Sequence, residues 1–468
     1  MNTSDAFHRY TKKVCGQIRW KKAHDIVSRE IENHLHDQRD AYMAQGDTES
    51  VAEEKALLQM GDAVSVGMAL DQTHRPSPQW AMIGLVMLLS GIGAIIQFCY
   101  YDNALAAAPA GNISIARFAF ALPLGILLFA AAYFLDFSFI GKYPYLLPVA
   151  LLGIDIVAQL IGVDFNGKNW LSIGRFAISP ISLSLPFPLA FCGLLYHFRH
   201  KRNGYLLGGL FAAFFCVQLV CFHTMSGLFV FVCAAGSLML FAAVRGCFPG
   251  NTKRLFLLFV VAGIVLFAMF LWANSYYAYR MNTLFAVFRP ETDPQNVGYF
   301  PLLLRNIMEH SVFWGKGNPL EIADYSAILY SGNFRADFLL TFLSYEYGWG
   351  IAMFLVLLLT GFLAFGLHKA FRQKSILGQM VSLSILCTFA GEVFVYILNN
   401  LGYPLIAPIA LPFLSYGTTA LLLHMALAGI LLSTFRTGEV FRDKELLTFL
   451  KPPLFQWDNG KLIISFKG

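Results

Sequence analysis

The sequence predicts an all-α polytopic membrane protein with about ten transmembrane helices, a large extracytoplasmic loop between helices 7 and 8, and a small N-terminal cytoplasmic helical domain. Hydrophobic residues make up 57% of the 468 residues and charged residues only 13%, whereas soluble domains contain roughly 25% charged residues. Residues 1–76 hold 22 of the 62 charged residues, so the rest of the chain is even more apolar than this average. The composition argues against a large soluble enzyme, a disordered protein and a nucleic-acid-binding protein.

Residues 1–76 are expected to form a cytoplasmic helical domain. Its first 22 residues are basic and its remainder is acidic, so the basic stretch could lie on anionic lipid or form a solvated helix face. Ser50 and Glu53 fit a capping box, and Gly46 and Gly61 are typical helix stops. The domain resembles short helical prefix domains found ahead of some bacterial, especially Gram-positive, membrane proteins, in the residues Glu30-Ile31, Ala41-Tyr42, Ala52-Glu53-Glu54-Lys55-Ala56 and Met60-Gly61-Asp62.

The membrane body, residues 77–436, contains ten apolar segments long enough to cross a bilayer. A transmembrane helix needs about 20 mostly apolar residues, and helices are expected because backbone groups inside the bilayer must be satisfied internally. The segments lie near 80–101, 113–135, 143–163, 176–197, 204–222, 225–244, 255–274, 338–367, 376–398 and 409–434.

The distribution of basic residues between these segments predicts the topology. Alternate loops carry ten Lys and Arg residues, whereas the short loops on the other side carry two, Lys168 and Arg175. Because basic residues accumulate on the cytoplasmic side, both termini are expected in the cytoplasm of a multi-pass cell membrane protein. The long connection of about 275–337 then lies outside and contains six of the 16 acidic residues that follow residue 76. Residues 437–468 form a cytoplasmic tail, in which Trp457 to Lys461 is a plausible hairpin turn.

Five ionisable residues in or beside the spans are candidates for chemistry, because an unpaired charge in the bilayer is costly. They are Arg117, Asp155, Asp337, Glu346 and Glu392. Asp337 starts the eighth span, where it could act as a base, bind a cationic group or cap the helix. Glu346 lies nine positions later, on the opposite face of a continuous helix. Glu346 and Glu392 could each enter a cavity or pair with Arg117.

The segment from Leu411 to Thr419 resembles LPFxSYGGSS, the signature of the SEDS family of shape, elongation, division and sporulation proteins, which includes RodA, FtsW and SpoVE. Several further segments resemble motifs of this family and occur in the same order. The other matches are Arg289 to Pro294 with Gly298-Tyr299 (DPExDPxGxGY), Gly315-Lys316-Gly317 (GKG), Arg335-Ala336-Asp337-Phe338 (HTDF), Glu346 (the second Glu of EE), and Asn166 to Gly174 with Pro180 (NGAxRWIxxG and QPSE).

The chain also departs from these motifs. The residues that differ are Ser182 and Leu185 in place of Glu and Lys, Arg335 and Ala336 in place of His and Thr, Thr418 in place of Gly, and Tyr396 in place of Asn. The chain is therefore identified as a divergent member of the family, and reduced or altered activity stays open. The presumed catalytic carboxylate, Asp337, is retained.

The resemblance implies a peptidoglycan glycosyltransferase that polymerises lipid II at the outer face of the membrane, with Asp337 as general base and inversion at the donor carbon. Its cell-wall role would be in shape, division or sporulation. The expected partners are lipid II, membrane lipids and a class B penicillin-binding protein, with no nucleic acid. A divalent cation (Mg or Mn) is a candidate cofactor, and no protein metal ligands are assigned. The substrate-binding candidates are Lys168, Arg280, Arg305, Lys316, Arg335, Glu346, Ser415 and Tyr416.

Two alternatives stay open on the sequence. A flippase for lipid-linked precursor would use Arg117, Asp155 and Glu392 as a polar path, with Asp337 as an outer gate. A non-catalytic scaffold for a cell-wall synthase complex would explain the loss of the Glu and Lys at positions 182 and 185. An ATP-driven pump is disfavoured because neither cytoplasmic part contains a nucleotide-binding glycine loop.

Overall fold

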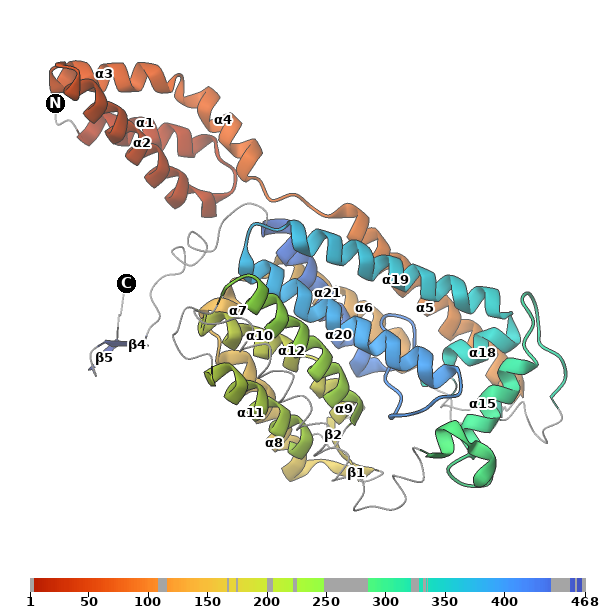
Figure 1. Ribbon diagram of the computed structural model, residues 1–468. Helices are drawn as coiled ribbons and strands as arrows, with labels where there is room; N and C mark the ends of the chain where they lie inside the picture. Colours follow the sequence, from red (N-terminus) through yellow and green to blue (C-terminus); the bar gives the residue numbers. More distant parts are fainter. Residues whose placement is uncertain are drawn as a thin grey trace. The chain divides into compact units, whose positions relative to one another are not determined.

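The computed structural model describes residues 4–107, 116–165, 168–173, 176–199, 205–221, 225–247, 285–320, 328–330, 334, 336–438, 455–458 and 461–464. The chain divides into two compact units (Figure 1). The N-terminal unit is built from residues 1–78, with 374–376 and 436–468, and the membrane unit contains residues 79–373 and 377–435.

The N-terminal unit is helical, as predicted. Its helices are α1 (Ser4–Gln17), α2 (His24–Ala44), α3 (Glu49–Met60) and α4 (Ala63–His74), with a short 3₁₀ turn at Lys21–Ala23. Helix α1 packs against both α2 and α4, and α2 packs against α3. Gly46 and Gly61 follow helix ends with φ of +102° and +85°, which confirms both helix stops.

The predicted capping box at Ser50 and Glu53 is wrong. Helix α3 begins at Glu49, and its N-cap is Thr48, whose side chain makes no capping hydrogen bond. The side chain that caps a helix in this unit belongs to Asp62, which accepts a hydrogen bond from the Ser65 backbone N–H at 3.0 Å.

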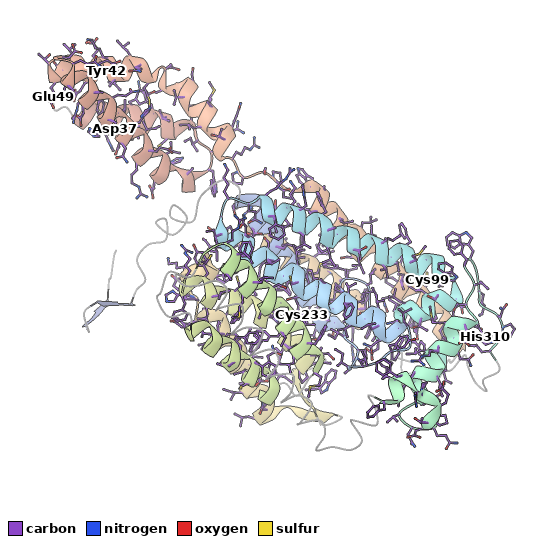
Figure 2. All side chains as sticks on the ribbon, in the orientation of Figure 1. Asp37, Tyr42, Glu49, Cys99, Cys233 and His310 are labelled. Carbon is purple, nitrogen blue, oxygen red and sulfur yellow. The ribbon has the colours of Figure 1, made fainter. Side chains whose placement is uncertain are left out.

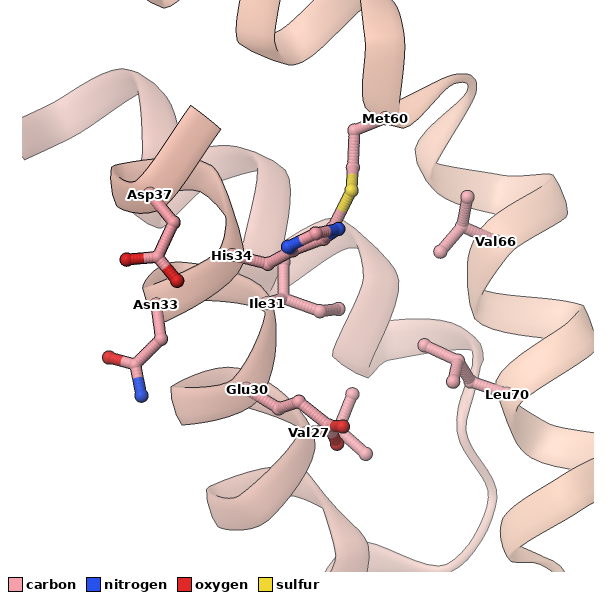
Figure 3. Close-up of a pocket in the computed structure, with 9 residues that line it drawn as sticks. All are labelled: Val27, Glu30, Ile31, Asn33, His34, Asp37, Met60, Val66 and Leu70. Carbon is pink, nitrogen blue, oxygen red and sulfur yellow. The ribbon is translucent and has the colours of Figure 1, made fainter. Parts of the chain in front are cut away.

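An open groove of about 510 Å³ lies along α2 and α4 (Figure 3). Its apolar lining comes from Val27 and Ile31 of α2, Met60 at the end of α3, and Val66 and Leu70 of α4. Four polar residues of α2 also line it, namely Glu30, Asn33, His34 and Asp37. None of the residues that line the groove is among those that the sequence predicts for the site.

The membrane unit is a bundle of apolar helices. Among the described residues, seven helices are long and apolar enough to cross a membrane: Trp80–Tyr101 of α5 (Trp80–Ala107), α6 (Ala116–Phe134), Pro180–His197, α12 (Met225–Val244), α19 (Trp349–Arg372), α20 (Ile376–Asn400) and α21 (Thr418–Thr437). Two shorter apolar helices are α8 (Leu146–Ile161) and Gly209–Gln218, the latter inside α11 (Tyr205–Cys221). These helices confirm the all-α polytopic class. The predicted span at 255–274 lies outside the described residues.

Within this unit, α10 (Phe187–His197) packs against α8, α11 and α12, and also against the short helix α7 (Phe139–Lys142). On another side α19 packs against α5, as the ribbon shows (Figure 1). Figure 2 shows Cys99 on α5 and Cys233 on α12, and both are free thiols. Neither cysteine therefore forms a disulfide bond in this structure.

Three predicted spans have clearly different boundaries in the structure. The span predicted from 409 starts only at Thr418, with α21. Strands β1 (Val163–Phe165), β2 (Lys168–Ile173) and β3 (Phe176–Ile178) form an antiparallel sheet in the order β1-β2-β3. The span predicted from 176 therefore starts only with α9 (Pro180–Ser184), whose N-cap Ser179 and first-turn Pro180 fix its beginning.

Another difference is that the predicted single span at 338–367 consists of two separate helices. Helix α18 (Leu339–Glu346) ends before Gly348, and α19 follows. Gly348 has a φ of +103°, and a Cβ there would lie 2.5 Å from the Phe313 carbonyl oxygen. The break is therefore set by close contact with a distant loop, which hydropathy does not report.

The predicted hairpin in the C-terminal tail is confirmed. Strands β4 (Phe455–Asp458) and β5 (Lys461–Ile464) are antiparallel, and Asp458 pairs with Lys461. In the sequence the two strands are separated by Asn459 and Gly460, the residue pair that favours a hairpin.

Candidate functional site

Asp337 lies in the turn immediately before α18, and its side chain is partly exposed. The N-cap position of α18 belongs to Phe338, so Asp337 precedes the capping position by one residue. Phe338 is buried and packs against Phe300 and Phe334, with ring centroids 5.8 and 5.6 Å apart. The turn thus holds Asp337 beside an aromatic cluster in which Phe334 and Phe338 are buried and Phe300 is exposed.

The Tyr396 hydroxyl, from α20, bridges the backbone on either side of Asp337. It accepts a hydrogen bond from the Leu339 N–H at 2.9 Å and donates one to the Ala336 carbonyl at 3.0 Å. Tyr396 is completely buried. The first N–H groups of a helix have no intrahelical partners. The Tyr396 hydroxyl provides a partner for one of them, the Leu339 N–H, which no neighbouring side chain caps.

Asn400 makes the matching contacts one helical turn further along α20. Its Nδ2 donates to the Asp337 carbonyl at 3.1 Å, and its Oδ1 accepts from the Thr341 N–H at 3.0 Å. The Thr341 hydroxyl donates in turn to the Asn400 carbonyl at 2.8 Å. We call Tyr396 and Asn400 together the Asp337 clamp. Residues four apart lie on one helix face, so α20 presents both side chains to the same turn.

The Gly315-Lys316-Gly317 segment is attached to the other end of α18. Gly315 N–H donates to the Tyr347 carbonyl at 3.0 Å, and Gly317 N–H to the Tyr345 carbonyl at 2.7 Å. A Cβ at position 317 would lie 2.7 Å from the His310 carbonyl oxygen and equally close to the Tyr345 ring. Glycine is therefore required for this approach. His310 itself directly follows α15 (Tyr299–Glu309), as Figure 2 shows.

Lys316 is held by Glu346, the last residue of α18. Lys316 Nζ lies 2.9 Å from Glu346 Oε1, with the lysine side chain 53% exposed and the glutamate 13%. Asp337 and Glu346 therefore stand at opposite ends of an eight-residue helix. This agrees with the expectation that they are not a paired acid and base of the glycosidase kind.

Arg305, on α15, is engaged with the backbone. Its Nε donates to the Gly402 carbonyl at 3.2 Å, its Nη2 donates to the Val287 carbonyl, and its guanidinium lies 4.5 Å from the Tyr403 ring centroid. These contacts attach α15 to the turn after α20. They give Arg305 a structural role, and its predicted contact with substrate stays a prediction.

Ser415 and Tyr416 occupy the turn before α21. Ser415 is buried, and its Oγ accepts from the Leu411 N–H at 2.8 Å. The partly exposed Tyr416 ring stacks on Phe118 of α6, with 6.2 Å between centroids. The Ser415 side chain thus stabilises the turn in which it lies, whereas the Tyr416 ring stays partly exposed.

The same turn contains Phe413, with a φ of +66°. Gly93 of α5 faces it, and a Cβ at Gly93 would lie 2.4 Å from the Phe413 carbonyl oxygen. Gln97 Nε2 donates to the Leu414 carbonyl at 3.2 Å. The signature segment, Leu411 to Thr419, therefore contains a strained turn that is held against α5. Its small residues alone predict only a close helix–helix contact.

The remaining intramembrane charges do not pair as the sequence suggested. Glu392 Oε1 lies 3.0 Å from His424 Nε2, and both side chains are buried. Arg117 is exposed at the start of α6, so Arg117 as the partner of Glu392 or of Glu346 is wrong. Asp155 accepts a hydrogen bond from Gln159 Nε2 at 3.1 Å.

Two predicted residues, Arg280 and Arg335, lie outside the described residues, and Lys168 is the first residue of β2, opposite Phe165. Sequence reasoning considered only Arg, Asp and Glu within the spans and so missed Asn400, Thr341 and His424. The signal that could have found Asn400 is the polar pair Asn399-Asn400 at the end of an apolar span.

A family model described as cell cycle protein, FTSW_RODA_SPOVE, matches residues 79–438, well over half of the chain. The chain belongs to the FtsW/RodA/SpoVE family. This confirms the family inferred from the motifs and makes the chain a bacterial multi-pass membrane protein.

Curated relatives carry names from the same family. The probable peptidoglycan glycosyltransferase FtsW of Trichlorobacter lovleyi is 25% identical over 62% of this chain and 74% of its own length. Stage V sporulation protein E of Bacillus subtilis is 24% identical over 59% and 74%. The peptidoglycan glycosyltransferase MrdB of Escherichia coli K12 is 24% identical over 63% and 77%.

Solved structures share the fold. A chain from "Structural coordination of polymerization and crosslinking by a peptidoglycan synthase complex" aligns with a TM-score of 0.58 and 22% identity, over 77% of this chain and 98% of that chain. The rod shape determining protein RodA of Thermus thermophilus aligns with a TM-score of 0.53 and 18% identity over the same shares.

Two departures of this FtsW/RodA/SpoVE member are now located. Ser182 lies in α9, where its hydroxyl is 2.8 Å from that of the N-cap Ser179, and Leu185 follows the helix and is 2% exposed. Both side chains complete local packing at positions where the resemblance predicts a Glu and a Lys. The polar contacts that such a pair would make are replaced here by a helix cap and an apolar contact.

Proposed function

We propose that the chain is a peptidoglycan glycosyltransferase that polymerises lipid II into glycan strands at the outer face of the cytoplasmic membrane. The observation that carries the proposal is Asp337, a partly exposed carboxylate whose backbone is fixed from both sides by buried side chains. The names of the curated relatives support the reaction class.

The reaction requires little of the protein beyond a base and a cationic environment. The acceptor sugar hydroxyl attacks the anomeric carbon of the donor, forming a carbon–oxygen bond as the bond to the polyprenyl pyrophosphate breaks. Asp337 takes the hydroxyl proton and later releases it to solvent, and inversion follows from this single displacement. A positioned general base contributes about 10²- to 10⁴-fold to such a step.

The departing pyrophosphate needs positive charge near the outer leaflet. Lys316 is the described candidate, because its ammonium is half exposed and its loop is fixed to α18. Arg280, Arg335 and Lys168 are further candidates by sequence.

A divalent cation is compatible with this arrangement. The described residues contain no cluster of three or more His, Cys, Asp or Glu side chains that could hold a metal. Magnesium, however, is commonly held by one or two carboxylates together with substrate phosphates. Such an ion would neutralise the pyrophosphate charge, and Asp337 keeps its role as the base.

The proposal includes a cellular setting. Both termini lie in the cytoplasm of a Gram-positive bacterium, as the basic loops and the prefix domain favour. A class B penicillin-binding protein is the proposed partner, which the peptidoglycan synthase complex of the structural relative supports. The role in shape, division or sporulation follows from whichever partner is bound.

A non-catalytic scaffold is the second candidate, favoured by Ser182 and Leu185. The flippase alternative lacks such support: in the described part of the chain Glu392 pairs with His424, Asp155 contacts Gln159 and Arg117 is exposed. These groups do not form a continuous polar path there.

The deciding experiment is lipid II polymerisation by the purified protein, with and without a class B penicillin-binding protein, with products separated on a gel. Asp337→Asn should abolish polymer formation, whereas Glu309→Gln, an exposed carboxylate on α15, should not. Glycan strands from Asp337→Asn at the wild-type rate would exclude Asp337 as the base. Rescue of a deletion strain by Asp337→Asn would favour the scaffold.

A further inference from the structure

We propose that Tyr396 and Asn400, the Asp337 clamp, are positioning residues that set the reach of the Asp337 carboxylate toward the acceptor hydroxyl. The proposal rests on the glycosyltransferase function proposed above. Neither side chain is a reacting group, since both act on the backbone that carries Asp337.

The turn that carries Asp337 needs an external support. It lies between two residues of helical backbone, Ala336 and the start of α18, and the N-cap residue Phe338 makes no side-chain capping hydrogen bond. Without the clamp, the N–H groups of Leu339 and Thr341 would lack partners at a buried helix start. The clamp therefore decides the backbone path through Asp337.

The clamp acts on both sides of the carboxylate at once. Tyr396 joins the residue before Asp337 to the second residue after it, and Asn400 joins Asp337 itself to Thr341. Tyr396 is 0% exposed and Asn400 3% exposed. The hydrogen bonds from the Leu339 and Thr341 N–H groups to the clamp are buried, so water cannot replace these two partners.

One of the two clamp residues, Tyr396, departs from the family motif. Tyr396 stands where the resemblance predicts Asn, and Ala336 stands where it predicts Thr. The structure joins these two departures through the hydrogen bond from the Tyr396 hydroxyl to the Ala336 carbonyl. The altered sequence beside Asp337 thus has its own support on α20.

The competing interpretation is that the clamp only caps α18 and contributes stability. The two interpretations differ in what a missing hydroxyl does to turnover. A displacement of about 1 Å at a reacting group can lower a rate about 100-fold, whereas a simple loss of a cap leaves the folded fraction equally active.

The test is Tyr396→Phe in the full-length protein, with kcat and KM measured for lipid II. We expect kcat to fall at least tenfold and KM to stay within twofold, because the lost hydroxyl acts on the backbone of the Asp337 turn and not on the substrate. Thr341→Val, which removes the hydroxyl that contacts Asn400, should lower kcat less. An unchanged kcat in Tyr396→Phe overturns the proposal, as does a loss that lies entirely in KM.

The matched control is Tyr100→Phe. Tyr100 is also 0% exposed, and its hydroxyl donates to a backbone carbonyl, that of Leu329, at 2.8 Å. Thermal midpoints of both variants are measured in the same detergent. If Tyr100→Phe lowers the midpoint and kcat as much as Tyr396→Phe does, the clamp is structural and the positioning role is refuted.

A second measurement separates this proposal from the proposed function. Asp337→Glu displaces the carboxylate by one methylene group, so removing the Tyr396 hydroxyl in that background should cost less than threefold in kcat. If the Tyr396 substitution lowered kcat by the same factor in the Asp337→Glu background as in the wild type, Tyr396 would not act through the position of the Asp337 carboxylate. A wild-type protein whose polymerisation does not depend on Asp337 would refute the function itself.

Discussion

The buried pair of Glu392 and His424 provides a quantitative test of the membrane unit's packing. The two side chains come from α20 and α21, are 0% and 1% exposed, and meet at 3.0 Å. His424 also contacts the rings of Phe389 and Phe413, with centroids 5.7 and 6.0 Å away. The perturbation is His424→Leu, which removes the partner and keeps most of the volume.

The magnitude follows from what Glu392 loses. Its Oε1 loses the imidazole, while its Oε2 is already buried without a hydrogen-bond partner. Removing one partner of a buried ion pair typically costs about 3–5 kcal/mol, because an uncompensated buried charge remains. Replacing both partners by apolar residues of similar volume is often neutral or stabilising by about 1–4 kcal/mol. The single variant should therefore be much less stable than the double variant.

The assay is thermal unfolding in detergent at one fixed scan rate, with the monodisperse fraction as readout. In a unit of about 350 residues each kcal/mol shifts the midpoint by about 1–1.5 °C, so His424→Leu should lower it by roughly 5 °C. The double variant, Glu392→Met with His424→Leu, should recover most of this loss. A midpoint for His424→Leu within about 1 °C (about 1 kcal/mol) of the wild type would refute a charged pair. Equal losses in the single and double variants would show that shape, not charge, decides the cost.

Two further predictions concern the Lys316 loop and the N-terminal unit. Gly317→Ala should detach the loop from α18, because the added Cβ would lie 2.7 Å from the His310 carbonyl oxygen. The rate of amide hydrogen exchange at Gly315 should then rise. The control is Gly361→Ala on α19, where a Cβ meets nothing within 4 Å and the exchange rate at Gly315 should not change. Hydrogen bonds from the Ser65 backbone N–H and then the Ser65 hydroxyl lower the pKa of Asp62. The stability that this helix cap contributes should therefore be fully present above the ordinary Asp pKa of 3.8 and be lost as pH falls through the lower pKa of the folded protein. At neutral pH, Asp62→Ala should speed amide exchange in the first turn of α4. Unchanged exchange in that turn would contradict a capping role for Asp62.

The sequence located the candidate residues better than it explained them. Asp337, Lys316 and Glu346 were recognised from motifs, and the structure attaches the last two to each other. Arg305 was selected for its charge, yet its guanidinium contacts backbone carbonyls from 18 and 97 positions away. A positive charge in an outer loop has the same sequence signature whether it binds a pyrophosphate or a helix end.

What the sequence determined by itself is the class of protein and most of its spans. Hydropathy depends on residue type summed over a local window, so segments of about 20 apolar residues are evident without any tertiary information. The family followed in the same way, because ordered motifs are properties of the chain alone.

Only the tertiary structure decided how Asp337 is held. The partners of its turn, Tyr396 and Asn400, lie 57 to 63 positions away along the chain. Their contacts exist because α20 packs beside α18 and brings one face of its last turns to a helix start with unpaired N–H groups. Composition and hydropathy cannot report such contacts, because a buried hydrogen bond depends on where two distant backbones meet and not on how apolar either segment is.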